Sequence, residues 1–265
     1  MNNANQSNHQ KEDLIFLFII LGVVACVCLI CICIIASTSV SLFNSPSGDP
    51  FTFIPSTPTP APAYCPKVPS DRTLEINETF DNNKKDWTVG LEYDDYGKTR
   101  QDIADGKYKI QASASATQGV YRQYKPLMPY KTYDFYLKAD VRQVEGPLDS
   151  EYGIVFRNNA SGDLYNFGIT DNQEFFFDQW FTDDWFNLLP ITYTPIVNPS
   201  EPNQLTVLAQ GAHFSLCINR LLVAEIENDD IVVGKAGFAY SLFNEGDEAE
   251  FEFDNFRLYV PPTTE

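Results

Sequence analysis

Hydrophobic and polar residues follow three successive patterns along the chain, and each pattern predicts a different kind of structure. Residues 14–36 (LIFLFIILGVVACVCLICICIIA) form an apolar run without a single charge. Residues 37–70 are rich in Pro, Ser and Thr, with STPTPAPA at their centre. In residues 71–260, apolar and polar side chains alternate in short segments such as KYKIQA and EFEFDNFRL. We therefore expect a short polar tail at 1–13, an apolar span, a linker, one domain, and a C-terminal tail at 261–265.

The apolar run is long enough to cross a membrane as one helix. At about 1.5 Å per residue it would extend roughly 34 Å, which exceeds the hydrocarbon thickness of about 30 Å. A cleaved secretory signal and a lipoprotein signal, with Cys26 as the acylated residue, are the two alternatives. Lys11 precedes the run, and no further Lys or Arg occurs before Lys67, which favours a cytoplasmic N-terminus. We expect a single-pass cell-membrane protein whose C-terminal domain is extracellular.

The linker at 37–70 is predicted to act as a spacer. Eight of its residues are prolines, from Pro46 to Pro69. Proline-rich chain adopts the extended polyproline II conformation, at about 3.1 Å per residue. We expect an extracellular stalk that holds the domain away from the membrane.

The alternation in residues 71–260 predicts an all-β domain. A period of two residues places one face of each strand in a core and the other in solvent, which is typical of antiparallel sheets. Turn clusters such as DG at 105–106 and NEGD at 244–247 separate the alternating segments, and no segment shows a sustained helical period. So many short strands in one domain predict a two-sheet antiparallel jelly-roll sandwich.

Composition narrows the range of partners. The 265 residues include 36 acidic and 18 basic side chains, a net charge of −18. Nucleic-acid binding depends on clustered Lys and Arg, so this balance argues against it. With 20% charged and 14% aromatic residues, the chain is too apolar for a wholly disordered protein. An acidic domain suits neutral or cationic ligands and divalent cations.

A series of short segments in this domain resembles a known superfamily. They are, in order, ETFDN from Glu78, WTVG from Trp87, IADGKY from Ile103, EYGIVFR from Glu151, FSLCINRLLVA from Phe214, GKAGFA from Gly234 and FDNFRL from Phe253. Their order resembles concanavalin A-like lectin/glucanase domains, most closely the laminin-G-like and 3-keto-disaccharide-hydrolase-like branch, which is common in membrane-tethered external modules of bacteria. The resemblance implies a jelly roll over about 180 residues. It does not imply one function, because lectins, carbohydrate-binding modules, glycosidases and adhesion domains share this fold.

One string of carboxylates suggests glycosidase chemistry. Glu245, Asp247 and Glu250 match the Glu-x-Asp-x-x-Glu spacing with which glycosidases of the resembled superfamily place three acids on one strand. Residues 244–247, however, have the composition of a turn, and the alternation that follows directs Glu250 outward. We interpret the string as a solvated hairpin.

Other catalytic candidates are equally isolated. Asp183 and Asp184 lie between two tryptophans and could share a proton in a cleft, but such pairs more often face water in a loop. His213 is the only histidine of the domain and has no second histidine for nucleophilic or metal chemistry. We predict no catalytic residues, and whether the protein is an enzyme stays open.

Aromatic residues mark the best candidate for ligand binding. Sugars bind to aromatic rings flanked by hydrogen-bonding groups. In the segment FFFDQWF from Phe175, every second residue faces the core, which leaves Trp180 on the other face. We predict surface recognition by Arg157, Asn166, Trp180 and Trp185, although an aromatic stripe in a sandwich more often belongs to the core.

Two further features concern the ends of the domain. Phe80-Asp81-Asn82 near its start is echoed by Phe253-Asp254-Asn255 near its end, and the resemblance to calcium-carrying lectin folds implies a structural calcium ion at Asp81 and Asp254. The alternative is that these residues cap strands. Four of the six cysteines lie in the apolar run, which leaves Cys65 and Cys217 for a disulfide in an oxidising compartment.

The sequence thus predicts a membrane-anchored extracellular recognition module that binds a glycan or another cell-surface polymer without catalysis. The alternatives are a glycoside or 3-keto-glycoside hydrolase, and a structural or protein–protein interaction domain.

Overall fold

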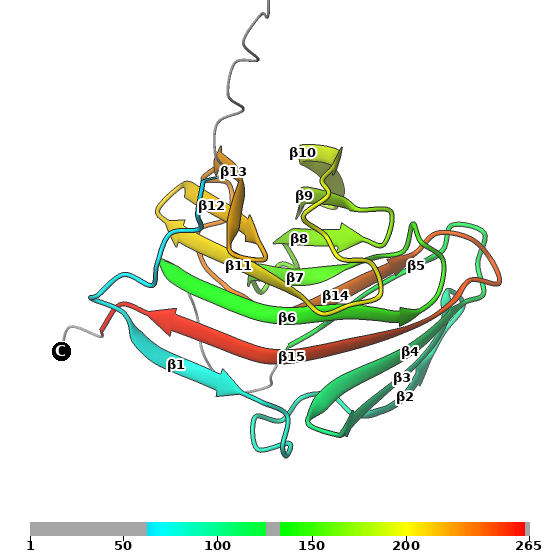
Figure 1. Cartoon of the computed structure of the whole chain (residues 1–265). Helices are drawn as coiled ribbons and strands as arrows, with labels where there is room; N and C mark the ends of the chain where they lie inside the picture. Colours follow the sequence, from blue (N-terminus) through cyan, green and yellow to red (C-terminus); the bar gives the residue numbers. More distant parts are fainter. Residues whose placement is uncertain (1–62, 126–132, 263–265) are drawn as a thin grey trace, which may run out of the picture. The chain divides into compact units, whose positions relative to one another are not determined.

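A computed structural model of the protein describes residues 63–125 and 133–262, and Figure 1 shows it as a sandwich of two antiparallel sheets. The predicted all-β class is confirmed. The predicted transmembrane segment at 14–36 and most of the linker lie outside the described residues. Within the described stretches, no helix is long and apolar enough to cross a membrane.

The larger sheet, called sheet A below, has nine strands. Its order is β13 (Leu221–Glu227), β12 (His213–Ile218), β11 (Asn203–Gln210), β6 (Phe135–Glu145), β15 (Glu248–Val260), β4 (Lys107–Ala114), β3 (Gly97–Ala104) and β2 (Gly90–Tyr93), with β1 (Thr73–Glu78) paired to β15. The smaller sheet, sheet B, has the order β10 (Asp184–Tyr193), β9 (Glu174–Phe181), β8 (Leu164–Thr170), β7 (Glu151–Asn158), β14 (Lys235–Leu242) and β5 (Val120–Tyr124). Strands β6 and β15 run side by side through the middle of sheet A (Figure 1).

Aromatic side chains fill the space between the sheets. Phe238 on β14 stacks on Phe253 of β15, with ring centroids 4.3 Å apart. Trp87 comes from the segment between β1 and β2 and lies 5.2 Å from Phe238. Burying one large aromatic side chain contributes about 2–3 kcal/mol, so this shared core is what holds the two sheets together.

Strand β15 shows how the sequence pattern becomes structure. Ala249, Phe251 and Phe253 face the core, as the alternation predicts. At Asn255 the backbone has a φ of 52° and the register against β6 shifts, which is a bulge. Because of this extra residue, Phe256 also turns inward although it lies three positions after Phe253.

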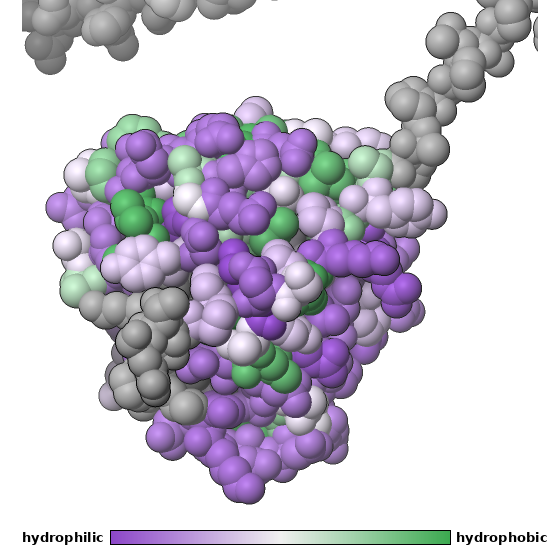
Figure 2. Space-filling model, turned by 90° about the vertical axis from the view of Figure 1, so that its left-hand side faces the viewer, coloured by the Kyte–Doolittle hydropathy of each residue, from purple (hydrophilic) through white to green (hydrophobic). Residues whose placement is uncertain are grey.

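A disulfide between Cys65 and Cys217 ties the end of the linker to β12. The backbone nitrogen of Cys65 donates to the carbonyl of Arg220 at 2.9 Å, and Tyr64 forms a bridge with Leu221. The sandwich therefore includes residues before position 71. The side of the sandwich seen in Figure 2 is mainly hydrophilic, with apolar residues in small separate patches.

Candidate functional site

The outer face of sheet B is strongly curved. Tyr121 lies on β5 and Trp185 on β10, which are the two opposite edge strands of this sheet. Their rings nevertheless meet edge to face, with centroids 5.1 Å apart and an angle of 81°. Side chains from opposite edges can meet on this side only if the sheet curls toward it. The outer face of sheet B is therefore concave.

The curved face has an apolar floor of its own. Val155 on β7, Leu164 on β8 and Ala239 on β14 form a small buried cluster apart from the main core. Tyr121 and Trp180 pack against this cluster. The aromatic residues on the outside of sheet B are thus supported by a buried apolar cluster.

Gly168 allows a further ring to lie close to that floor. A Cβ built on Gly168 would come within 2.4 Å of the Phe176 ring, so the buried ring lies directly against the backbone of β8. Any side chain at position 168 would push Phe176 outward.

A tight hairpin positions the two tryptophans. Trp180 on β9 and Trp185 on β10 are directly paired, and their ring centroids lie 5.4 Å apart. Thr182 and Asp183 form the two-residue loop, with φ of 53° and 62°, which matches the primed turns that connect twisted strands. The backbone nitrogen of Thr182 donates to the Asp163 carboxylate at 3.1 Å and fastens the hairpin to the β7–β8 loop. Trp185 is 39% exposed, so its ring is available to a ligand.

Two carboxyl groups share the concave face. Glu151, the first residue of β7, accepts a hydrogen bond from Ser241 Oγ at 3.1 Å. Asp178 on β9 accepts one from Asn187 Nδ2 at 2.8 Å. Neither carboxylate forms an ion pair with a residue of the described stretches.

The pKa of both carboxyl groups is raised. Burial raises the pKa of Glu151 to about 7, and the nearby charge of Asp178 also raises it. Burial likewise raises the pKa of Asp178 to about 6, against the lowering effect of the Asn187 hydrogen bond. A carboxyl group with a raised pKa at a curved, part-exposed face is characteristic of a functional site.

Asn166 lies beside Asp178 on the same face. The two residues are directly paired between β8 and β9, and Val155 is the partner of Asn166 on its other side. Asn166 is 4% exposed, and its Oδ1 has no hydrogen-bond partner among the described residues. An unsatisfied buried carbonyl costs about 1–3 kcal/mol, so this oxygen destabilises the fold as long as no donor reaches it.

Arg157, which the sequence placed at the surface, lies inside the sandwich instead, with 2% exposure. Its guanidinium donates to the carbonyls of Tyr133, Gly211 and Ile231 at 2.6–3.0 Å and stands 4.8 Å from the Phe214 ring centroid. The alternation fails here because Arg157 has a φ of 49° and the register of β7 against β14 shifts beside it. The structure therefore brings together Asn166, Trp180 and Trp185, and gives Arg157 a structural position.

The proposed calcium ligands do not form a coordination shell. Asp81 accepts from Thr79 Oγ1, and both carboxylate oxygens of Asp254 accept from Asn255. Calcium takes about six to eight oxygen ligands, whereas no group of three metal-binding side chains occurs among the described residues. Burial, with the charges of Asp140 and Asp81, raises the pKa of Asp254. These residues do not fit a preformed calcium site, and the ion stays a prediction that unfolding with excess chelator would test.

The carboxylate string at 245–250 lies where the sequence placed it. Asn244 to Asp247 form the turn between β14 and β15, closed by the Asp247 carboxylate accepting from the Asn244 backbone nitrogen at 2.8 Å. Glu250 faces outward on β15 and accepts from Gln111. The three acids are therefore not gathered on the concave face.

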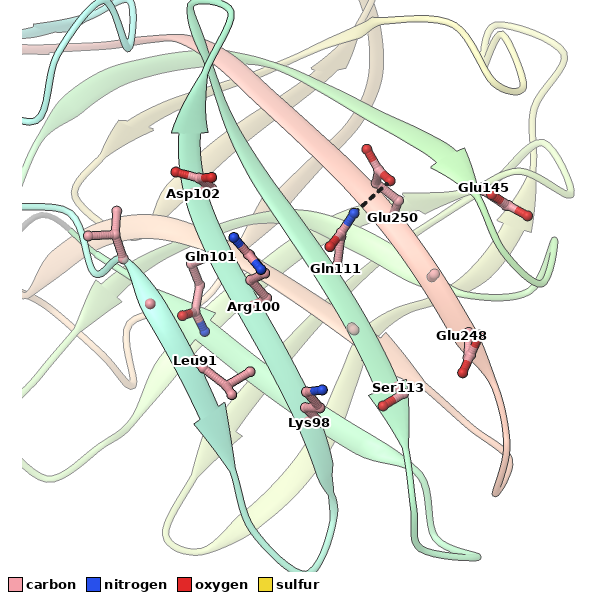
Figure 3. A pocket seen from close by; sticks show the side chains of 14 residues that line it. Leu91, Lys98, Arg100, Gln101, Asp102, Gln111, Ser113, Glu145, Glu248 and Glu250 are labelled. Atoms are coloured by element: carbon pink, nitrogen blue, oxygen red, sulfur yellow. Dashed lines mark hydrogen bonds between the residues drawn. The ribbon is translucent and has the colours of Figure 1, made fainter.

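A broad groove of about 810 Å³ lies elsewhere, on the outer face of sheet A (Figure 3). Lys98 and Arg100 on β3 border one side of it, and Glu248 and Glu250 on β15 border the other. None of the described residues that line it is aromatic. We therefore take the concave face of sheet B, rather than this groove, as the candidate functional site.

Comparisons with known proteins agree with this architecture. No protein-family model matches the chain, and no curated protein matches it in sequence. Solved structures do match it. The sandwich has the concanavalin A-like fold.

Three solved structures illustrate the likeness. A Bacillus subtilis protein of unknown function with a galectin-like fold has a TM-score of 0.52 and 13% identity, over 74% of this chain and 99% of that one. An endo-β-1,3-glucanase from Pyrococcus furiosus has a TM-score of 0.51 and 9% identity, over 76% of this chain and 100% of that one. A GlcNAcα1-4Gal-releasing endo-β-galactosidase from Clostridium perfringens has a TM-score of 0.53 and 10% identity, over 74% of this chain and 65% of that one.

Three residues of the concave face escaped the sequence reasoning. Asp178 had a local signal, because it shares the outward parity of Trp180 two residues later. Glu151 stands at the start of a strand whose remaining residues are nearly all buried, a position that alternation alone does not distinguish. Tyr121 reaches the site only through the curvature of the whole sheet.

Proposed function

We propose that this protein is a membrane-tethered extracellular module that binds a glycan on the concave outer face of sheet B, without catalysis. The observation that carries the proposal is the contact of Tyr121, Trp180 and Trp185 beside Asn166 and Asp178. Aromatic rings offer a flat apolar surface to the C–H faces of a sugar, while amide and carboxylate groups accept hydrogen bonds from its hydroxyls.

The fold is compatible with this function. Two of the similar structures are an endo-β-1,3-glucanase and a GlcNAcα1-4Gal-releasing endo-β-galactosidase. Because their sequence identity to this chain is low, the likeness extends to the fold alone. The laminin-G-like branch of the superfamily stays a prediction.

The same proposal includes the cellular location. The apolar segment at 14–36 would anchor the protein, and the Pro-rich linker would hold the sandwich outside the cell. External protease applied to intact cells should remove the sandwich and leave a membrane-bound N-terminal fragment. A sandwich that survives this treatment but is digested after cell lysis would contradict the proposed orientation.

A glycan array with the full-length protein tests ligand binding. We expect binding to at least one neutral or amino-containing polysaccharide, and a loss of at least about tenfold in affinity, or about 1.4 kcal/mol, when Trp180 and Trp185 are both changed to Ala. Tyr93→Ala is the matched control, because Tyr93 is an exposed aromatic residue on β2 of sheet A. Binding that is equal in the double variant and the control would show that the concave face is not the site.

A glycoside hydrolase is the second candidate, and one observation favours it. Glu151, whose pKa burial raises to about 7, could hold a proton for transfer at neutral pH, and Asp178 lies near enough to affect that pKa. Release of reducing sugar that is abolished in Glu151→Gln, with retained binding, would support this enzyme. If no polysaccharide on the array is bound or cleaved, the remaining alternative of a structural or protein–protein domain gains support.

A further inference from the structure

The acids of the concave face differ from two other acids of the protein. The exposed carboxylate of Asp94 forms an ion pair with Arg122 at 2.8 Å, and the part-buried carboxylate of Glu252 forms one with Lys107 at 2.7 Å. Among the described residues, Glu151 and Asp178 have only neutral donors, which are Ser241 and Asn187. Burying a carboxylate without a cation is costly, so this arrangement lowers stability unless something else supplies the positive charge.

The cationic side chain at the end of β5 does not supply this charge. Lys125 Nζ donates to Asn158 Oδ1 at 2.6 Å and to Gln123 Oε1 at 2.9 Å, so it is already engaged. Two further titratable groups lie at this site. Burial and the charge of Glu151 raise the pKa of Tyr121 on β5, and the charge of Asp178 on β9 raises the pKa of Glu151. Neither can bring a positive charge to the face.

The aromatic residues favour the same kind of occupant. Tyr121, Trp180 and Trp185 form a chain of edge-to-face contacts at the site. The face of an aromatic ring attracts a cation, by about 0.5–2 kcal/mol depending on desolvation. Rings combined with carboxylates are suited to a substituted ammonium group.

Asn166 provides an independent observation. Its Oδ1 is buried and has no partner among the residues that the structure describes, and Asn166 is paired with Asp178 in the sheet. A hydroxyl group offers one hydrogen to such acceptors, whereas a primary ammonium group offers three. The unpartnered amide oxygen and the two carboxylates together form a set of acceptors for one donor-rich, positively charged group.

We infer that the glycan bound by this face carries free amino groups, as a glucosamine polymer without its N-acetyl groups does. The inference rests on the proposed function and narrows it to one class of sugar. The ammonium group lies among the acceptors Glu151, Asp178 and Asn166, and the sugar ring packs on Trp180 and Trp185. Uronic acids and sulfated sugars are excluded by the repulsion of the two carboxylates.

The test is isothermal titration calorimetry with the full-length protein in nonionic detergent at pH 6.5. The probes are the hexasaccharides of glucosamine and of N-acetylglucosamine, which differ only in their amino groups. We expect the glucosamine hexasaccharide to bind at least about tenfold more tightly, and the preference to weaken at high salt. Its binding should also release protons, measured as a heat that depends on the buffer, because the ammonium group favours the ionised carboxylates.

The variant Glu151→Gln/Asp178→Asn should lose the preference and the proton release, while Glu250→Gln, an acid on sheet A, should retain both. Equal or tighter binding of the acetylated hexasaccharide would overturn the inference and leave the proposed function standing. If neither hexasaccharide binds but another glycan on the array does, the inference also fails alone. Failure of every glycan would reject the proposed function itself.

Discussion

Part-buried acidic side chains have different partners on the outer faces of the two sheets. On sheet A, Glu252 lies within 2.7–3.7 Å of the cationic groups of Lys107, Lys109 and Arg142. Burial raises the pKa of Glu252, but the Lys107 hydrogen bond and the neighbouring cations outweigh this effect and hold the pKa below its usual value. On sheet B, Glu151 has no cationic partner among the described residues, and its pKa is raised. The ion-paired Glu252 stabilises the fold. The unpaired Glu151 lowers stability, at a face that we assign to a ligand.

The two outer faces belong to sheets that share one core. Phe238→Ala tests this shared core, and we expect it to have the largest effect on the free energy of unfolding. Phe238 is fully buried and stacks on Phe253. Its loss should lower the free energy of unfolding in urea by about 3–5 kcal/mol. Phe243→Ala, at an exposed phenylalanine just after β14, should cost less than about 1 kcal/mol. Similar losses in both variants would contradict a shared core at Phe238.

Glu151→Gln should stabilise the protein at alkaline pH. The pKa of Glu151 is raised from 4.5 to about 7, so the folded state holds a proton that the unfolded state loses. Stability therefore falls as pH rises from about 4.5 to about 7, by about 2–3 kcal/mol. At pH 8 the variant should be more stable than wild type by about this amount, and at pH 4 the gain should vanish. Urea unfolding at both pH values measures the difference in stability between the variant and the wild type. A variant that is less stable than wild type at pH 8 would refute the raised pKa of Glu151.

Glu252→Gln should change the stability in the opposite direction from Glu151→Gln. The lowered pKa of Glu252 means that its contribution is present above the usual value of 4.5 and is lost as the pH falls through the folded-state pKa. At pH 7 the variant should be less stable by about 1 kcal/mol, because the exposed parts of the cationic partners are screened by solvent. The difference should shrink in high salt and disappear once the pH lies below the folded-state pKa of Glu252. A stabilised variant at pH 7 would remove the contrast between the two faces.

Substitution of Lys98 or Arg100 by Ala should have the smallest effect on the free energy of unfolding. Both border the groove of sheet A, and neither forms an ion pair within the described part of the chain. Changing each to Ala should alter the free energy of unfolding by less than about 0.5 kcal/mol. Lys107→Ala, which removes a partner of Glu252, is the matched comparison and should cost more. A larger loss at Lys98 than at Lys107 would show that ion pairing is not what distinguishes these cations.

Much of the fold could be predicted from residue pattern. The alternation in β15 identified Ala249, Phe251 and Phe253 as core residues, and the turn at 244–247 kept the nearby carboxylates off a catalytic face. Parity also separated Phe175 and Phe177 from Trp180. These predictions succeed because the period of a strand is a local property of the backbone.

The surroundings of the predicted recognition residues were predictable only in part. Alternation placed Trp180 on the outer face of its strand, whereas Arg157 was misplaced because a positive φ and a register shift interrupt the alternation at that residue. Ligand binding by Trp180 and Trp185 stays a prediction. The chemical state of Glu151 could not be predicted either, since its raised pKa depends on which side chains surround it in three dimensions.

The sequence by itself thus determined that the domain is a sandwich of antiparallel strands and which parity of most strands is buried. The tertiary structure alone decided that Tyr121 meets Trp185 across the outer face of sheet B, and that Glu151 and Asp178 share this face with no cationic partner in the described part of the chain. The physical reason is that alternation is set residue by residue, whereas curvature is the sum of small twists between all the strands of a sheet. Only that sum brings opposite edges together and gives the acidic domain one concave, aromatic face.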